Sequence, residues 1–219
     1  MRGDRIPTHV LSIQMIPRAD PALCAALKLP EGCRSVGILT TDCDDVSYTA
    51  LDEATKKAEV RVVYARSMYA GSSNASTRLA GEFIGILAGP DPAAVRSGLE
   101  AAVRCAETEA AFYSACDDDS VVYFAHCISR TGSYLSAEAG IPEGAAMAYL
   151  IAPPAEAVMG LDAALKAADV ELRLFYGPPT ETNFAGGLLT GEQAACEAAC
   201  KAFADKVCEV AETPLHYQS

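Results

Sequence analysis

Apolar and polar positions along the chain follow two alternating periods, one of two residues and one near 3.6. In the first half, the two-residue period predicts strands at residues 9–16, 35–42, 59–66 and 82–89. The helical period predicts helices at residues 20–28, at residues 47–58 and from Asp91 to about Cys116. Strands and helices mixed in this way indicate an α+β arrangement built on a largely antiparallel sheet.

The second half repeats the same order of elements. Its predicted strands lie at residues 121–129, 147–152, 169–177 and 185–191. Its predicted helices lie at residues 132–139, at residues 156–168 and from Gly191 to about Ala211. The chain therefore contains an internal repeat of one structural unit.

Direct sequence similarity supports the repeat. The stretch LDEATKKAEVRV begins at Leu51, and LDAALKAADVEL begins at Leu161; LPEG and IPEG separate corresponding elements of the two halves. Repeats of about 110 residues are domain-sized, unlike the shorter periods of solenoids. The acidic string Asp117-Asp118-Asp119 is typical of a solvated linker. We therefore expect two domains, residues 1–116 and 117–219, each a mainly antiparallel sheet flanked by helices.

Composition narrows the possible partners. The chain has 219 residues, of which 51% are hydrophobic, and a formal net charge of −12. This charge repels nucleic acid and anionic membrane surfaces, and no apolar run approaches the ~20 residues of a membrane helix. Nine cysteines at irregular spacings, without a secretory leader, indicate reduced thiols in the cytoplasm.

The cysteines carry no recognisable catalytic or metal-binding pattern. Cys196, Cys200, Phe203 and Val207 recur at helical spacing, which predicts a buried stripe. Cys127 lies in a predicted strand, and Arg130 follows too closely for the phosphate loop of a phosphatase.

The sequence also shows no sign of an enzyme. His9 and His216 lie near the termini with no acid, base or nucleophile evident around them. The motifs of nucleotide, zinc and nucleophile-elbow sites are absent from the sequence. We expect no catalytic residues, no metal and no cofactor.

Specific motifs of this chain resemble one known family. GLDAALKAADVEL followed by AGGLLTG resembles the bacterial microcompartment (BMC) shell domain, and the whole chain resembles its tandem, circularly permuted form. SRTGSYLS, DCDDVSY, RSMYAG and MAYLIAPPAEA further resemble the shell proteins of ethanolamine utilisation, over residues 8–215. The resemblance implies a homotrimer with pseudo-sixfold symmetry that packs with neighbouring shell proteins into a hexagonal layer.

The resemblance assigns two lysines to the edge of the tile. Lys56 and Lys166 match the family's edge lysine, and they occupy the same place in both repeats. The alternative is that each is an ordinary solvated lysine.

The resemblance also implies a central pore lined by the loops at residues 65–80 and 176–185. Both loops are longer than a tight hairpin needs, and the first is rich in Gly, Ser and Ala, which favours a gated pore over a fixed surface loop. The expected pore residues are Arg66, Tyr69, Gly71, Tyr176, Pro178, Thr180 and Glu181.

An ethanolamine site is the third implication. Asp44, Asp45 and Glu82 match acidic residues that hold ethanolamine in the family, and carboxylates satisfy both the charge and the donors of an ammonium group. The matching residues outside this acidic group are Phe112, Thr182, Asn183 and Phe184. The alternative for the acidic turn is a solvated or helix-capping role.

Two classes of function compete at this point, and an enzyme of unknown reaction is the third alternative. The first is a shell tile of the microcompartment whose pore passes small molecules and whose acidic sites bind ethanolamine. The second is a soluble sensor of cationic amines that uses the same acidic site to regulate a partner.

Overall fold

The structure is a computed structural model that describes residues 1–68, 79–178 and 180–215. The chain forms two compact units, neither of which is continuous in sequence. Unit 1 comprises Met1–Pro7, Ala111–Arg130 and Ala139–Ser219, and unit 2 comprises Thr8–Ala110 and Thr131–Glu138. The boundary between residues 116 and 117 stays a prediction about the sequence repeat, because the units exchange short segments across it.

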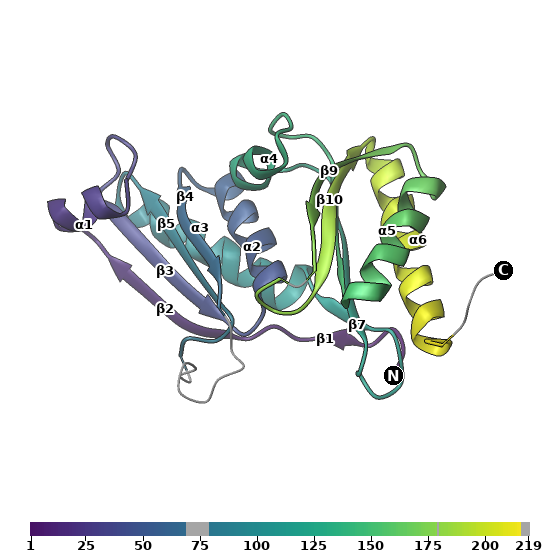
Figure 1. The fold of residues 1–219 in the computed structure, drawn as a ribbon. Helices are drawn as coiled ribbons and strands as arrows, with labels where there is room; N and C mark the ends of the chain where they lie inside the picture. Colours follow the sequence, from purple (N-terminus) through teal and green to yellow (C-terminus); the bar gives the residue numbers. More distant parts are fainter. Residues whose placement is uncertain (69–78, 179, 216–219) are drawn as a thin grey trace. The chain divides into compact units, whose positions relative to one another are not determined.

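Unit 2 is a four-stranded antiparallel sheet with helices packed on it (Figure 1). Its helices α2 and α3 pack on the sheet and on each other. The sheet has the order β2 (Val10–Ile16), β3 (Ser35–Thr41), β5 (Phe83–Gly89) and β4 (Arg61–Ser67). The helices are α1 (Pro21–Ala26), α2 (Asp44–Lys57) and α3 (Pro92–Arg104), with the π-helical segment η1 (Cys105–Glu109) and all but the last residue of α4 (Ser133–Ala139).

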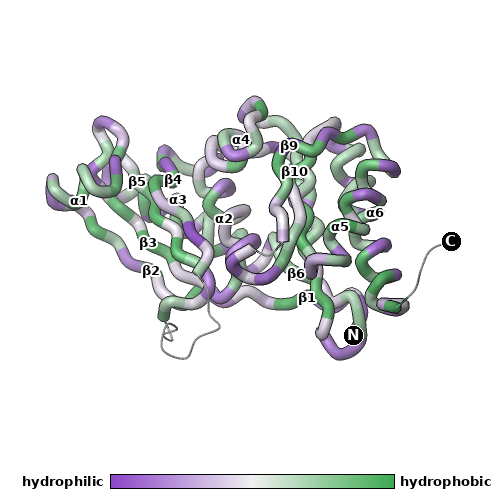
Figure 2. The backbone as a smooth tube through the Cα atoms, in the orientation of Figure 1, coloured by the Kyte–Doolittle hydropathy of each residue, from purple (hydrophilic) through white to green (hydrophobic). Residues whose placement is uncertain are grey.

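Unit 1 is built on a six-stranded antiparallel sheet. The helices α5 (Pro154–Ala167) and α6 (Gln193–Glu212) pack on the sheet and on each other. Segments of α6 alternate between hydrophobic and hydrophilic in Figure 2, as a helix with one buried side requires. The strand order is β1 (Arg5–Ile6), β6 (Phe112–Ser114), β7 (Val122–Ile128), β8 (Met147–Ala152), β10 (Ala185–Gly191) and β9 (Val170–Tyr176).

The two sheets share one topology. The order β2-β3-β5-β4 in unit 2 corresponds to β7-β8-β10-β9 in unit 1, and in both the third strand in space is the last in sequence. The helices correspond in the same way, α2 with α5 and α3 with α6. The predicted fold class, two tandem α+β domains on antiparallel sheets, is confirmed.

The prediction of one long helix to about Cys116 is wrong. The helix α3 ends at Arg104 and η1 at Glu109, where the Ala110 N–H donates to the Cys105 carbonyl oxygen at 3.0 Å. The chain then extends into β6, whose Tyr113 pairs with Tyr123 of β7. The alanine-rich sequence before β6 favours a helix locally. Pairing of β6 with β7 instead satisfies the backbone hydrogen-bonding groups, and sequence periodicity does not reveal such pairing.

The buried side of α6 is the one predicted from its apolar spacing. Cys196, Phe203 and Val207 are fully buried on the inner side of α6, and Cys200 is 8% exposed, so the prediction that these cysteines are core residues is confirmed. All nine cysteines are free thiols. Within the described ranges, every helix is too short or too polar to cross a lipid bilayer.

Candidate functional site

Two acidic side chains open helix α2. Asp44 and Asp45 lie in its first turn, and each is 7% exposed; the helix begins at Asp44, three residues before its predicted start. The Asp45 N–H donates to Oδ1 of Asp44 at 2.9 Å. Carboxylates are favoured at a helix N-terminus because they face its unsatisfied N–H groups. The predicted capping role and a binding role are therefore compatible.

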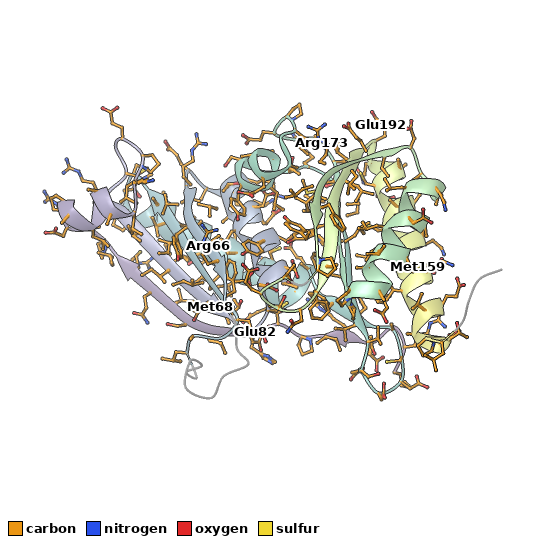
Figure 3. All side chains as sticks on the ribbon, in the orientation of Figure 1. Arg66, Met68, Glu82, Met159, Arg173 and Glu192 are labelled. Atoms are coloured by element: carbon orange, nitrogen blue, oxygen red, sulfur yellow. The ribbon has the colours of Figure 1, made fainter. Side chains whose placement is uncertain are left out.

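Glu82 is fixed beside this helix start by the backbone. Gly81 has a φ of +64°, and a Cβ at this position would lie 2.0 Å from the Thr41 carbonyl oxygen. The Glu82 N–H donates to the same oxygen at 2.9 Å, and the Glu82 carbonyl accepts from the Met68 N–H at 2.8 Å (Figure 3). The close approach that glycine permits thus anchors Glu82 at the end of β3.

The surroundings of Glu82 raise its pKa. Burial raises the pKa of the Glu82 carboxyl, and the negative charges of Asp44 and Asp42 raise it further. Burial also raises the pKa of the Cys43 thiol, with smaller contributions from Asp45 and Asp44, so this thiol stays protonated at neutral pH. A cation bound beside Glu82 would offset the negative charges that raise its pKa.

His9 has an acidic partner that the sequence analysis missed. Its backbone N–H and its Nδ1 each lie 2.7 Å from a carboxylate oxygen of Asp42. The expectation that no acid surrounds His9 was wrong because strand pairing, not sequence proximity, brings the two together: Val10 pairs with Thr41. The acidic stretch DCDD combined with the register of β2 and β3 was the signal available for this pair.

The remaining predicted ligand residues lie in unit 1 and form a compact turn of their own. The Phe112 and Phe184 rings meet edge to face with centroids 5.8 Å apart. Asn183 has a φ of +63°, a conformation that asparagine tolerates better than most residues. Oγ1 of Thr180 accepts from the Phe184 N–H at 3.1 Å, and the Asn183 N–H donates to the Thr180 carbonyl at 3.1 Å. Thr182 is half-buried in this turn.

The two groups occupy equivalent places in the repeats. Gly81 and Glu82 directly precede β5, and Asn183 and Phe184 directly precede β10. Both pairs begin with a residue of positive φ. The same turn therefore presents an acid in unit 2 and an aromatic ring in unit 1.

The predicted pore residues fall in strands as well as loops. Arg66 belongs to β4, where its guanidinium lies 5.8 Å from the ring centroid of Tyr64, and Tyr176 is the last residue of β9. The two loops therefore begin later than the sequence analysis expected, because ladder pairing with β5 and β10 continues through these residues. Pro178, Thr180 and Glu181 lie in the connection between β9 and β10. Tyr69 and Gly71 lie outside the described residues.

The two predicted edge lysines lie in the last turns of α2 and α5. The side chain of Lys56 is 24% exposed and pairs with Glu53. Lys166 is 74% exposed and donates to Asp162 at 2.6 Å. The lysines thus share a position in the repeat but not an environment.

The described residues contain no group of three or more His, Cys, Asp and Glu side chains arranged to hold a metal ion. The carboxylates at the start of α2 are acceptors that suit the charge and the N–H donors of an organic cation.

Comparison with known proteins identifies the family. Residues 35–116 match the BMC domain. The microcompartment shell protein EutL of Clostridium perfringens is 61% identical over 99% of this chain and 100% of its own length. The chain belongs to the EutL family of bacterial microcompartment shell proteins.

Solved structures agree with this assignment. The ethanolamine utilization protein EutL of Leptotrichia buccalis is 65% identical, with a TM-score of 0.97 over 99% of this chain and 100% of that one. A trimeric shell protein, PduB, is 22% identical, with a TM-score of 0.76 over 93% of this chain and 89% of that one, a likeness that shows the fold alone. The EutL family thus shares both sequence and fold with this chain along nearly its whole length.

Proposed function

We propose that this shell protein assembles as a homotrimeric tile with pseudo-sixfold symmetry, which packs with neighbouring shell proteins into a hexagonal layer. The observation that carries the proposal is that four strands of each unit follow the same order, β2-β3-β5-β4 in unit 2 and β7-β8-β10-β9 in unit 1. Two equivalent wedges in each chain complete a six-wedge ring from three copies. In this tile the connections between β4 and β5 and between β9 and β10 line a gated central pore for metabolites, and the chain has no catalytic role.

Electron microscopy of the concentrated protein tests the tile. Extended flat sheets with hexagonal spacing are the expected result. Dispersed particles that still bind amine would instead support the soluble amine sensor, the second candidate, which the acidic group at α2 also fits.

We further propose that Asp44, Asp45 and Glu82 bind ethanolamine through its ammonium group. Support comes from the burial of both aspartates, from the fixed backbone of Glu82, and from its raised pKa, which burial and then the charges of Asp44 and Asp42 cause. A cation that neutralises partly desolvated carboxylates gains charge-assisted hydrogen bonds there. The roles of Phe112, Thr182, Asn183 and Phe184 in binding the same ligand stay predictions.

Calorimetry with ethanolamine tests the acidic site. We expect Asp45→Asn to weaken binding about 10- to 100-fold, because a hydrogen bond to a charged group contributes about 1.5–3 kcal/mol. Asp205→Asn is the matched control, since Asp205 is an exposed acid on α6. Equal affinities for wild type and Asp45→Asn would remove Asp45 from the site.

If ethanolamine binds the closed pore better than the open one, it also regulates the pore, because a ligand shifts an equilibrium only through its differential affinity.

A further inference from the structure

The contact between α4 and α2 inside unit 2 is made by segments from different repeats. The side chain of Asp52 on α2 is 1% exposed, and its two carboxylate oxygens accept from the N–H groups of Gly132 at 2.7 Å and Leu135 at 2.9 Å. The Ser133 N–H donates to Oγ1 of Thr55 at 3.0 Å. A segment of the second repeat thus covers one face of the helix of the first repeat.

The tyrosine pair Tyr48 and Tyr134 extends this contact, with ring centroids 6.3 Å apart and nearly parallel planes. Leu135 of α4 is 2% exposed as a result of the packing. The side chains of α2 that contact the α4 segment are therefore Tyr48, Asp52 and Thr55, and the neighbouring Thr49 is also buried.

The same face of α5 in unit 1 is uncovered. Helices α2 and α5 have equal length and correspond residue by residue, so Tyr48 corresponds to Val158, Thr49 to Met159 and Thr55 to Leu165. Val158 is 49% exposed, Met159 (labelled in Figure 3) 37% and Leu165 38%. By contrast, Thr49 is 3% exposed. Apolar side chains thus lie exposed at the positions where their counterparts are covered.

The counterpart of α4 is uncovered as well. The motifs LPEG and IPEG align α1 with α4, so that Leu23 corresponds to Leu135 and Asp20 to Gly132. Leu23 is 38% exposed, and α1 has no buried residue. Helices α1 and α5 therefore correspond to α4 and α2, but Leu23 on α1 and Val158, Met159 and Leu165 on α5 are exposed.

We infer that α1 of one copy of this chain packs on α5 of a second copy, through Leu23 and Ala22 on α1 and Val158, Met159 and Leu165 on α5. The inference rests on the proposed tile and names the surface that joins its subunits. The contact is heterologous, so its repetition closes a ring of three copies when successive copies are related by a threefold rotation, as in the proposed tile.

The two kinds of contact differ in chemistry. Gly132 leaves room for Asp52 to cap α4, and a Cβ there would lie 2.2 Å from Oγ1 of Thr55. Asp20 instead caps its own helix by accepting from the Ala22 N–H at 2.8 Å. Helix α1 therefore lies farther from α5 than α4 does from α2, and the larger apolar side chains of α5 fill the additional space.

Cross-linking between copies tests the contact. The pair Ala22 and Val158 corresponds to the stacked tyrosines, so Ala22→Cys/Val158→Cys, treated with a short bismaleimide, yields covalent trimers at three times the chain mass of 22.9 kDa. Wild type controls for the native thiols, and Ala22→Cys/Lys201→Cys for an exposed site on α6. Neither control yields covalent trimers.

A substitution at the exposed Met159 gives a second readout. Met159→Glu weakens self-association about tenfold or more by sedimentation, with an unchanged circular dichroism spectrum, whereas Lys201→Glu leaves association unchanged. If the protein is a trimer but does not cross-link through Ala22 and Val158 and is not weakened by Met159→Glu, the proposed contact is wrong. The proposed tile is not contradicted by that result. A wild-type protein that stays monomeric at every concentration overturns both.

Discussion

Glu82 lies beside two other carboxylates, and its backbone is fixed against the end of β3. Its Cα therefore stays beside the start of α2, where the negative charge of Asp44 acts on its side chain. The residue therefore holds a proton more tightly than a solvated glutamate, and protonation competes with any bound cation.

The first prediction concerns the pH dependence of ethanolamine binding. Because the pKa of Glu82 is raised above the usual 4.5, its carboxylate is available at high pH and is lost as the pH falls through that raised value. We expect ethanolamine affinity, measured by calorimetry, to decline as the pH falls through the raised pKa of Glu82, and so to begin its decline at a higher pH than a solvated glutamate would cause. Glu82→Gln should bind more weakly and lose part of this decline; an identical pH profile in both proteins would contradict the assignment.

At the scale of single residues, the sequence identified the acidic group before α2 but not the histidine that pairs with one of its members. The DCDD stretch was evident, and the buried positions of Asp44 and Asp45 confirm that it is not an ordinary solvated turn. The pairing of His9 with Asp42 was not evident, because it depends on the register of two strands.

At the scale of elements, the contact between α4 and α2 depends on one buried side chain. Asp52 satisfies two backbone N–H groups at the start of a short helix that is too short to be stable alone. The segment that contains α4 is therefore held by tertiary hydrogen bonds rather than by its helix propensity.

The second prediction tests that dependence. Asp52→Ala leaves both N–H groups buried without an acceptor, which should lower the free energy of unfolding by about 2–4 kcal/mol in urea denaturation. Asp205→Ala, which removes an exposed acid paired with Lys201, should change it by less than about 0.5 kcal/mol. Equal effects of the two substitutions would show that the α4–α2 hydrogen bonds contribute little.

Elements with strong periodicity were predictable, and elements defined by pairing were not. The buried face of α6 and the strands β3, β5, β8 and β10 follow directly from their apolar spacing. The two-residue strand β1 and the three-residue strand β6 are too short to show a period, and they exist because they pair with each other and with β7. Local sequence cannot reveal such edge pairing.

At the scale of the whole molecule, the internal repeat made both the fold and the family accessible from sequence. The similarity between residues 51–62 and 161–172 placed equivalent helices in both halves, and the shared strand order confirms it. The exchange of segments between units was not predictable, because Thr131–Glu138 continues from β7 in sequence but packs with α2.

The third prediction concerns the layer of tiles. Lys166 is exposed at the end of α5, so Lys166→Asp should abolish ordered sheets in electron microscopy by reversing the charge at the proposed edge. The mass of the assembled ring in solution should not change. Lys201→Asp is the control, since Lys201 is similarly exposed on α6; loss of sheets in both variants would point to net charge rather than to the edge.

Covalent doubling of the repeat also restricts which closed shapes the protein can build. Every chain brings two wedges, so any ring that it forms contains an even number of them. The protein therefore cannot form a ring of five wedges, which is the ring that would bend a hexagonal sheet into a corner. In the proposed tile, the duplicated chain therefore builds flat facets of the shell, and the corners require other proteins.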